Sequence, residues 1–228
     1  MSVRAEQAKW AVIVLMRENP PRGLRLEDER RIDADELDLD LALGAFSQAV
    51  SRGDLDERLT AVEALVWLSD RRAISPLLRG LEDAMWYVRH AAAHGLTSFR
   101  PLPGWALEPI AAAMVDAEPA VRAQAASALG RLRHAGSITP LVTAVEDHFS
   151  CVRLAAAWAL EELGRAAITD PTAADSLSDL LEREDDQYVA YAAYWALGWQ
   201  GGSAAETRRA AFRWSDRGQA VWSAVARI

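Results

Sequence analysis

The stretch Val121-Arg122-Ala123-Gln124-Ala125-Ala126-Ser127-Ala128-Leu129-Gly130 carries the pattern that decides the fold of this chain. Val-Arg, a run of alanines and small residues, and then Leu recur from Val88 and from Val152, and both copies align with the first without gaps. A weaker copy begins at Val189. Segments that recur every 20–50 residues or so, at about a fixed spacing, indicate a repeat architecture in which each unit stacks on its neighbours.

Helical periodicity is present within each copy. Val121 and Ala125 are four positions apart, and Ala128 and Leu129 follow at the next turn of the same face. This spacing is typical of an amphipathic α-helix. We expect these residues to form the core and the small ones to let neighbouring helices approach closely.

Two further signals outside this helix keep the same register. An Asp stands five residues before the valine in three copies, and a proline stands seven residues before each Asp. Each unit is therefore predicted to contain a helix A that begins near the proline, a turn at the Asp, and a helix B with the Val-Arg signature. These residues are Asp83, Asp116 and Asp147, and Pro76, Pro109 and Pro140.

This pattern resembles the HEAT-like repeats of the phycobilisome-lyase type, over roughly residues 55–200. The resemblance implies an all-α solenoid, an armadillo-type superhelix of helical hairpins whose B helices line the concave surface. It implies little about function, because such repeats occur in bacterial proteins of many functions. The signatures of tetratricopeptide and ankyrin repeats do not appear in the sequence.

The domain organisation follows from the repeat. We predict a single α-solenoid domain over residues 1–228, with about six HEAT-like hairpins and an N-terminal helix from Val3 to Met16. Wider spacing predicts inserted loops at Thr97 to Trp105 and Arg165 to Asp175. The predicted parts are a leading helix and first helix A in 1–54, regular repeats in 55–200 and a C-terminal hairpin in 201–228.

Composition and charge restrict the class of partner. Hydrophobic residues make up 51% of the chain, which favours a buried core over disorder. The formal net charge is -8, the sign opposite to that of a protein that binds a phosphate backbone, so we do not expect nucleic acid. An acidic surface steers a basic protein partner, and it also simply keeps a protein in solution.

The cysteine content and the apolar runs bear on location. Cys151 is the only cysteine, so no intrachain disulfide is possible, and we expect a reducing, cytoplasmic location. We expect Cys151 to be buried because it precedes a core valine. The apolar run from Trp10 to Met16 is too short to span a bilayer, and no membrane partner is expected.

An Arg follows the first position of the helix B signature in four copies, at Arg58, Arg89, Arg122 and Arg153, and three of the four lie six residues after an Asp. Arg and Asp form bidentate hydrogen bonds, so we interpret this register as a structural ladder along the stack, rather than as a row of cations for an anionic ligand. The predicted members are Asp83, Arg89, Asp116, Arg122, Asp147 and Arg153.

One ridge of helix B, beside the buried face, becomes aromatic in the C-terminal half of the chain. Trp and Tyr dominate binding hot spots, so we interpret this ridge as a candidate partner-binding surface, formed by Leu154, Trp158, Tyr191, Tyr194, Trp195 and Trp199. The alternative is that these rings pack between repeats, because Trp is often largely buried. The remaining tryptophans are expected in the core, in loop packing or in end caps, and they are Trp10, Trp67, Trp86, Trp105, Trp214 and Trp222.

Few residues indicate a metal site or a catalytic site. His90 and His94 are four residues apart on a predicted helix, a spacing that can place two imidazoles on one metal ion, but no third ligand is near in sequence. We therefore expect no metal site. No phosphate-binding loop or nucleophile motif is recognised, so we expect no cofactor and favour a protein that is not an enzyme.

These features favour a non-enzymatic protein–protein interaction scaffold, which binds a partner of basic character on its concave B-helix face. The alternative is a small-ligand or chromophore-lyase-like protein with an aromatic-lined pocket. A nucleic-acid repair protein is disfavoured by the acidic charge. A scaffold predicts a broad open surface, whereas a small-ligand protein predicts a deep enclosed pocket.

Overall fold

The computed structural model describes residues 39–226. These residues form an all-α solenoid, and no β-strand occurs among them. The chain divides after Phe99 into two compact units, which are described separately. The predicted leading helix and Trp10 lie outside the described residues.

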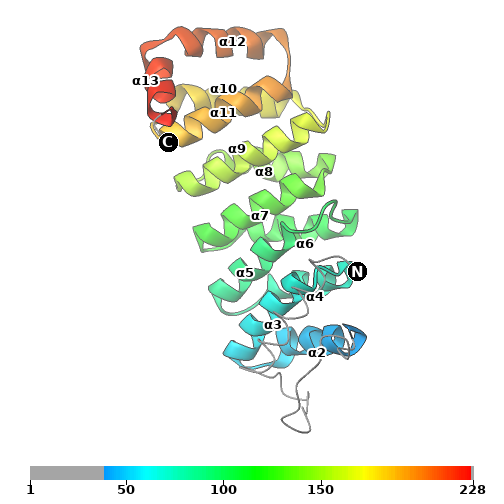
Figure 1. The fold of residues 1–228 in the computed structure, drawn as a ribbon. Coiled ribbons are helices and arrows are strands. Elements are labelled where there is room, and N and C mark those ends of the chain that lie inside the picture. Colours follow the sequence, from blue (N-terminus) through cyan, green and yellow to red (C-terminus); the bar gives the residue numbers. More distant parts are fainter. Residues whose placement is uncertain (1–38, 227–228) are drawn as a thin grey trace. The chain divides into compact units, whose positions relative to one another are not determined.

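The described part of unit 1 contains two helical hairpins, in which α2 pairs with α3 and α4 pairs with α5 (Figure 1). Asp54 caps α3: its carboxylate accepts a hydrogen bond from Glu57 N, and the Glu57 side chain accepts one from Asp54 N. The helices are α2 (Leu39–Arg52), α3 (Leu55–Leu68), α4 (Ile74–Gly80) and α5 (Trp86–Leu96).

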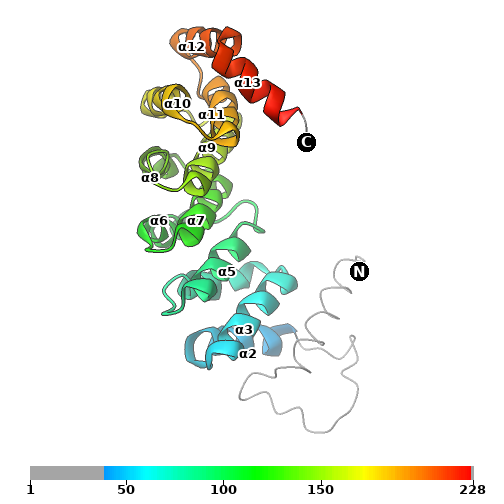
Figure 2. The same ribbon diagram turned by 90° about the vertical axis from the view of Figure 1, so that its left-hand side faces the viewer.

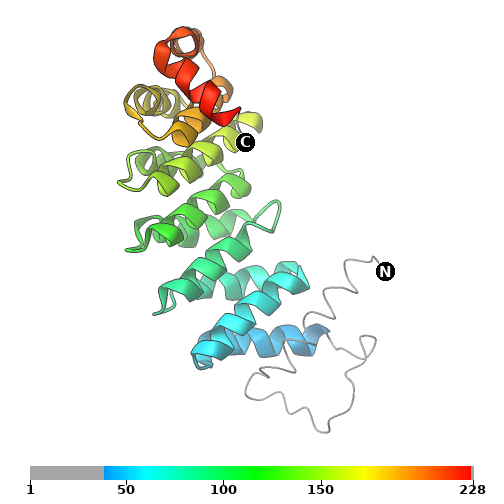
Figure 3. The same ribbon diagram turned by 60° about the vertical axis from the view of Figure 1, so that its left-hand side comes forward.

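Unit 2 contains four hairpins (Figure 2). The A helices are α6 (Leu107–Ala112), α8 (Ile138–Ala144), α10 (Pro171–Arg183) and α12 (Ser203–Trp214). The B helices are α7 (Pro119–Leu132), α9 (Ser150–Arg165), α11 (Gln187–Gln200) and α13 (Asp216–Val225). Helices α6, α8 and α10 form one layer and α7, α9 and α11 the other, and α12 and α13 cover the end beyond α11 (Figures 1 and 3).

The predicted core face of helix B is confirmed. Val121, Ala125, Ala128 and Leu129 are all 0% exposed. A glycine sets the spacing of α7 and α9, because a Cβ on Gly130 would lie 2.9 Å from the Cα of Ala159. The small residues thus allow the B helices to stack at close approach.

The A helices begin as the sequence predicts, and one loop differs. The prolines Pro76, Pro109 and Pro140 each occupy the third position of their helix, in the first turn. The loop predicted over Arg165 to Asp175 is shorter than expected. Helix α9 continues through Arg165, and Pro171 begins α10 because Asp170 caps it by accepting a hydrogen bond from Thr172 N.

Candidate functional site

Four aromatic side chains form a continuous ridge across the B helices of unit 2. The ring of Trp158 on α9 lies 6.2 Å from that of Tyr191 on α11, centroid to centroid, and Tyr191 lies 6.1 Å from Trp195. Trp222 on α13 extends the row, at 5.4 Å from Tyr191 and 6.5 Å from Trp195. All four contacts are edge-to-face, the geometry that aromatic quadrupoles favour. We call Trp158, Tyr191, Trp195 and Trp222 the aromatic ridge.

The aromatic ridge is accessible from solvent. Trp158 and Trp195 are 39% and 38% exposed, and Tyr191 and Trp222 are partly exposed. Leu154, one turn before Trp158, is also partly exposed. Neighbouring exposed indoles leave apolar area in water, and a patch of this kind is typical of an interaction surface.

Two of the candidate contact residues lie elsewhere. Tyr194 is 6% exposed and packs below the ridge, with its ring 5.0 Å from that of Trp222. It supports the indoles instead of presenting its own face, because position 194 turns toward α12. Trp199 is 47% exposed but lies at the end of α11, where Arg165 stacks on it at 5.5 Å. No ring contact among the described residues joins Trp199 to the ridge.

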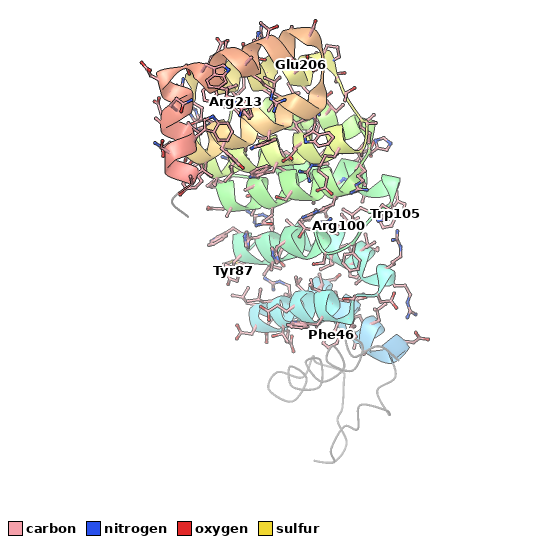
Figure 4. All side chains as sticks on the ribbon, turned by 45° about the horizontal axis from the view of Figure 1, so that its top comes forward. Phe46, Tyr87, Arg100, Trp105, Glu206 and Arg213 are labelled. Carbon is pink, nitrogen blue, oxygen red and sulfur yellow. The ribbon has the colours of Figure 1, made fainter. Side chains whose placement is uncertain are left out.

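A half-open pocket of about 340 Å³ lies at the C-terminal end of the ridge. Its side chains come from the last three helices, and we call it the C-terminal pocket. Arg213 lies at the end of α12 that faces α13, whereas Glu206 lies near the other end (Figure 4). The lining residues are Tyr194, Trp195, Arg213, Trp214, Gln219 and Trp222.

Arginines stack on the aromatic rings at this pocket. The guanidinium carbon of Arg209 lies 4.4 Å from the Tyr194 ring centroid and 5.9 Å from that of Trp195. Gly198 makes room for it, since a Cβ at this position would collide with the guanidinium. Arg213 lies 5.6 Å from the ring of Trp214 in the same way. Cation–π contacts of this kind hold the arginines in place without neutralising their charge.

Ion pairs link successive repeats within each unit. Arg122 Nε lies 2.7 Å from Asp147 Oδ2, and its Nη2 lies 2.9 Å from Oδ1, a bidentate pair. Arg58 pairs with Asp83 in the same way in unit 1, with Nε 2.6 Å from Oδ2. Each Arg reaches the Asp of the following repeat, while its Nη1 donates to carbonyl oxygens of its own turn. Arg89 makes the corresponding bond to Asp83 O at 2.8 Å.

The ladder has a member that the sequence analysis missed. Arg153 Nε lies 2.6 Å from Glu184 Oε2, and its Nη2 lies 2.8 Å from Oε1. Glu184 stands five residues before Val189, the position that Asp holds in other repeats, and this spacing was the available signal. The carboxylate at this position also accepts a hydrogen bond from the backbone N–H two residues later. Asp116 does so, since it accepts from Glu118 N at 2.9 Å.

The ladder shifts the pKa values of its members. Burial raises the pKa of the Asp147 carboxyl, but hydrogen bonds from Arg122 and from Phe149 N, with the Arg122 charge, outweigh burial and hold it below its ordinary value. Burial also raises the pKa of the Glu184 carboxyl. Hydrogen bonds from Arg153 and from Asp186 N outweigh burial, so the pKa of Glu184 is lowered as well. Both carboxylates are therefore stabilised in their charged form.

Comparison with known proteins identifies the repeat. Residues 107–198 match the family of HEAT repeats, and residues 57–83 match the PBS lyase HEAT-like repeat.

The chain contains HEAT-like repeats.

Solved structures share this fold. A designed armadillo repeat protein matches with a TM-score of 0.57 and 19% identity, over 88% of this chain and 96% of that chain. A crystal structure of an engineered protein matches with a TM-score of 0.55 and 19% identity, over 88% and 92%. The complex of CpcE and CpcF of phycocyanin lyase from Nostoc sp. has a TM-score of 0.48 and 23% identity, over 91% and 76%. A search of the curated proteins gave no match.

The two histidines considered as metal ligands, His90 and His94, stack on each other. The His90 and His94 rings lie 6.5 Å apart, and Trp86 lies 6.5 Å from His90 on the other side. Burial, and then the charge of His94, lower the pKa of His90. No group of three or more His, Cys, Asp or Glu residues suited to a metal ion occurs in the described part of the chain.

Several side chains of the HEAT-like repeats are more exposed than the sequence predicts. Trp67, Trp86, Trp105 and Trp214 are exposed, although we expected them in the core, in loop packing or in end caps. Cys151 is exposed as well, because it lies in the first turn of α9, outside the buried face. Arg213, Trp214, Gln219 and Trp222 were missed as site residues, because only their packing against α11 brings them together.

Proposed function

We propose that this chain is a non-enzymatic, cytoplasmic protein–protein interaction scaffold that binds its partner on the B-helix face of unit 2. One observation carries the proposal: the aromatic ridge, which continues through edge-to-face contacts over α9, α11 and α13 while Trp158 and Trp195 stay exposed. Trp and Tyr side chains in such clusters are the usual anchors of a protein interface. HEAT-like repeats supply a rigid frame for them.

The shape of the site favours a scaffold over a small-ligand protein. The C-terminal pocket has about 340 Å³ and is half open, near the lower limit of about 300–1,000 Å³ for drug-sized ligands. The aromatic ridge continues outside the pocket to Trp158, and a small ligand bound in the pocket would not contact this residue. No helix in the described part of the chain is long and apolar enough to cross a membrane.

The test compares partner capture by three forms of the full chain. Lysate proteins captured by the wild type are quantified by mass spectrometry and compared with those captured by the Trp158→Ala/Trp195→Ala variant. Truncation of one hot-spot Trp costs at least about 2 kcal/mol, or roughly a 30-fold loss of affinity, so the double variant should lose the partner. Circular dichroism first establishes that each variant is folded.

The matched control is Trp105→Ala, which removes a Trp that is 60% exposed in the same unit. Trp105 lies on the edge of unit 2 away from Arg213 (Figure 4). The Trp105→Ala control should capture as much of the partner as the wild type does. Calorimetry then measures the affinity of all three forms for the purified partner. Equal capture by the double variant and the wild type would contradict the proposal.

A further inference from the structure

The local charge at the C-terminal pocket differs from the charge of the whole chain. The formal net charge is -8, yet the pocket is lined by Arg213 and, among the residues that the structure describes, by no carboxylate. Arg209 borders the same site through its contacts with Tyr194 and Trp195. A partner that docks here meets cations, so the expectation of a basic partner from net charge does not extend to this surface.

The two arginines have their charges available. Among the described residues, neither Arg209 nor Arg213 forms an ion pair, and their contacts are with aromatic rings. Arg208, their neighbour on α12, differs, since its Nη1 lies 3.8 Å from Asp175 Oδ1. Arginines that stack on aromatic rings still have donors free for a carboxylate, and bidentate Arg–carboxylate pairs are among the stronger hydrogen-bonded contacts.

The unmatched polar atoms around the pocket are all donors. Within the described residues, Arg209 Nε and Trp222 Nε1 are buried and lack a hydrogen-bond partner. The Gln219 amide nitrogen already donates to Arg213 O at 3.0 Å. This end of unit 2 is therefore short of acceptors, which a carboxylate supplies and an ammonium group does not.

The apolar part of the pocket determines the rest of the ligand. Three indoles and the Tyr194 ring surround a volume of about 340 Å³, which suits one large apolar side chain. From these observations we infer that the C-terminal pocket binds an acidic peptide segment of the partner, in which carboxylates flank an aromatic residue. The aromatic residue enters between Trp195, Trp214 and Trp222, and the carboxylates pair with Arg213 and Arg209. This inference rests on the proposed function and specifies its partner.

The test titrates synthetic peptides into the full chain, followed by calorimetry and tryptophan fluorescence. The probe is Ac-Glu-Glu-Phe-Glu-Glu-NH2, with the matched peptides Ac-Lys-Lys-Phe-Lys-Lys-NH2 and Ac-Glu-Glu-Ala-Glu-Glu-NH2. The first should bind saturably, and each matched peptide should bind at least about tenfold more weakly, because it loses either the charge pairs or the anchor. Equal or tighter binding of the lysine peptide, or no saturable binding of the acidic one at millimolar concentration, would overturn the inference.

Variants on one helix locate the effect. Arg213→Gln and Trp214→Ala replace exposed side chains and should each weaken binding of the acidic peptide about tenfold. The matched control Arg208→Gln should bind the acidic peptide with an affinity within about twofold of that of the wild type. Loss of capture in Trp158→Ala/Trp195→Ala without a preference for the acidic peptide would overturn this inference alone. Binding of the acidic peptide without any partner lost in that variant would overturn the proposed function alone.

Discussion

At the scale of single residues, the pair Arg122–Asp147 shows why the Asp–Arg register is part of the repeat. The carboxylate serves two helices at once, since it accepts from Arg122 of the preceding repeat and from Phe149 N of its own turn. Side chains of both partners are mostly buried, at 13% and 15% exposure. Removal of either one leaves a partly buried charge without its partner, which is costlier than removal of both.

A double-mutant cycle tests this coupling. Arg122→Met should lower the free energy of unfolding by about 2 kcal/mol, since it leaves Asp147 without its charged donors. Asp147→Asn keeps an oxygen that can accept from Phe149 N, so it isolates the ion pair. The double variant should be less destabilised than the sum of the two single ones, measured by urea unfolding. Additive effects would show that the two residues contribute independently.

At the scale of the helix, close approach between B helices depends on glycine and alanine. Gly130→Ala places a Cβ 2.9 Å from Ala159 Cα and 3.0 Å from its Cβ, where the neighbour is backbone and cannot move aside. Overpacking of this kind costs about 1–3 kcal/mol, more than the gain of about 1 kcal/mol from the higher helix propensity of Ala. We expect Gly130→Ala to destabilise unit 2.

The same substitution at Gly44 is the matched control. Gly44 lies inside α2, is exposed, and a Cβ there would meet nothing within 4 Å. Only the propensity gain remains, so Gly44→Ala should stabilise unit 1 by up to about 1 kcal/mol. Hydrogen exchange, followed separately on α7–α9 and on α2–α3, measures the change in stability that each substitution causes. A change in stability of the same sign for Gly130→Ala and Gly44→Ala would contradict the packing argument.

At the scale of the whole molecule, the lowered pKa values of Asp147 and Glu184 predict acid sensitivity. Both groups are ionised in the folded and unfolded chain above their ordinary pKa values, which are about 4, so their stabilisation is fully present there. As pH falls, the unfolded chain binds protons first, and the stabilisation is lost as pH passes down through the folded pKa. Burial raises the pKa of Glu161 despite its bond to Arg165, so its contribution has the opposite sign.

A comparison with Asp147→Asn separates the ladder from the other groups. At neutral pH the wild type should be more stable than the variant, and the difference should shrink as pH falls below about 4. Thermal unfolding over a pH series measures it. The exposed control Asp179→Asn should stay close to the wild type throughout. A difference that does not change with pH would show that the ladder carboxylate is not the acid-sensitive group.

The repeat could be predicted from the amino-acid sequence, because a stacked fold reuses one set of local contacts. Val121, Ala125 and Leu129 follow a helical period that any unit must satisfy to bury a face, and the prolines mark helix starts through backbone geometry alone. The approximate position of the aromatic ridge also followed, since Trp158, Tyr191 and Trp195 share one side of their helices. All of these are short-range regularities.

Which aromatic rings are in contact and which charges remain available depends on how the helices pack together. Tyr194 is buried and Trp214 is exposed because of the way in which α12 and α13 pack against α11, which the predicted C-terminal hairpin does not specify. The same packing brings Trp222 against Tyr191 and places Arg213 beside an indole, where no carboxylate of the described residues pairs with it. Exposure and local charge depend on neighbours from other helices, so the net charge of the chain does not determine the charge at the C-terminal pocket.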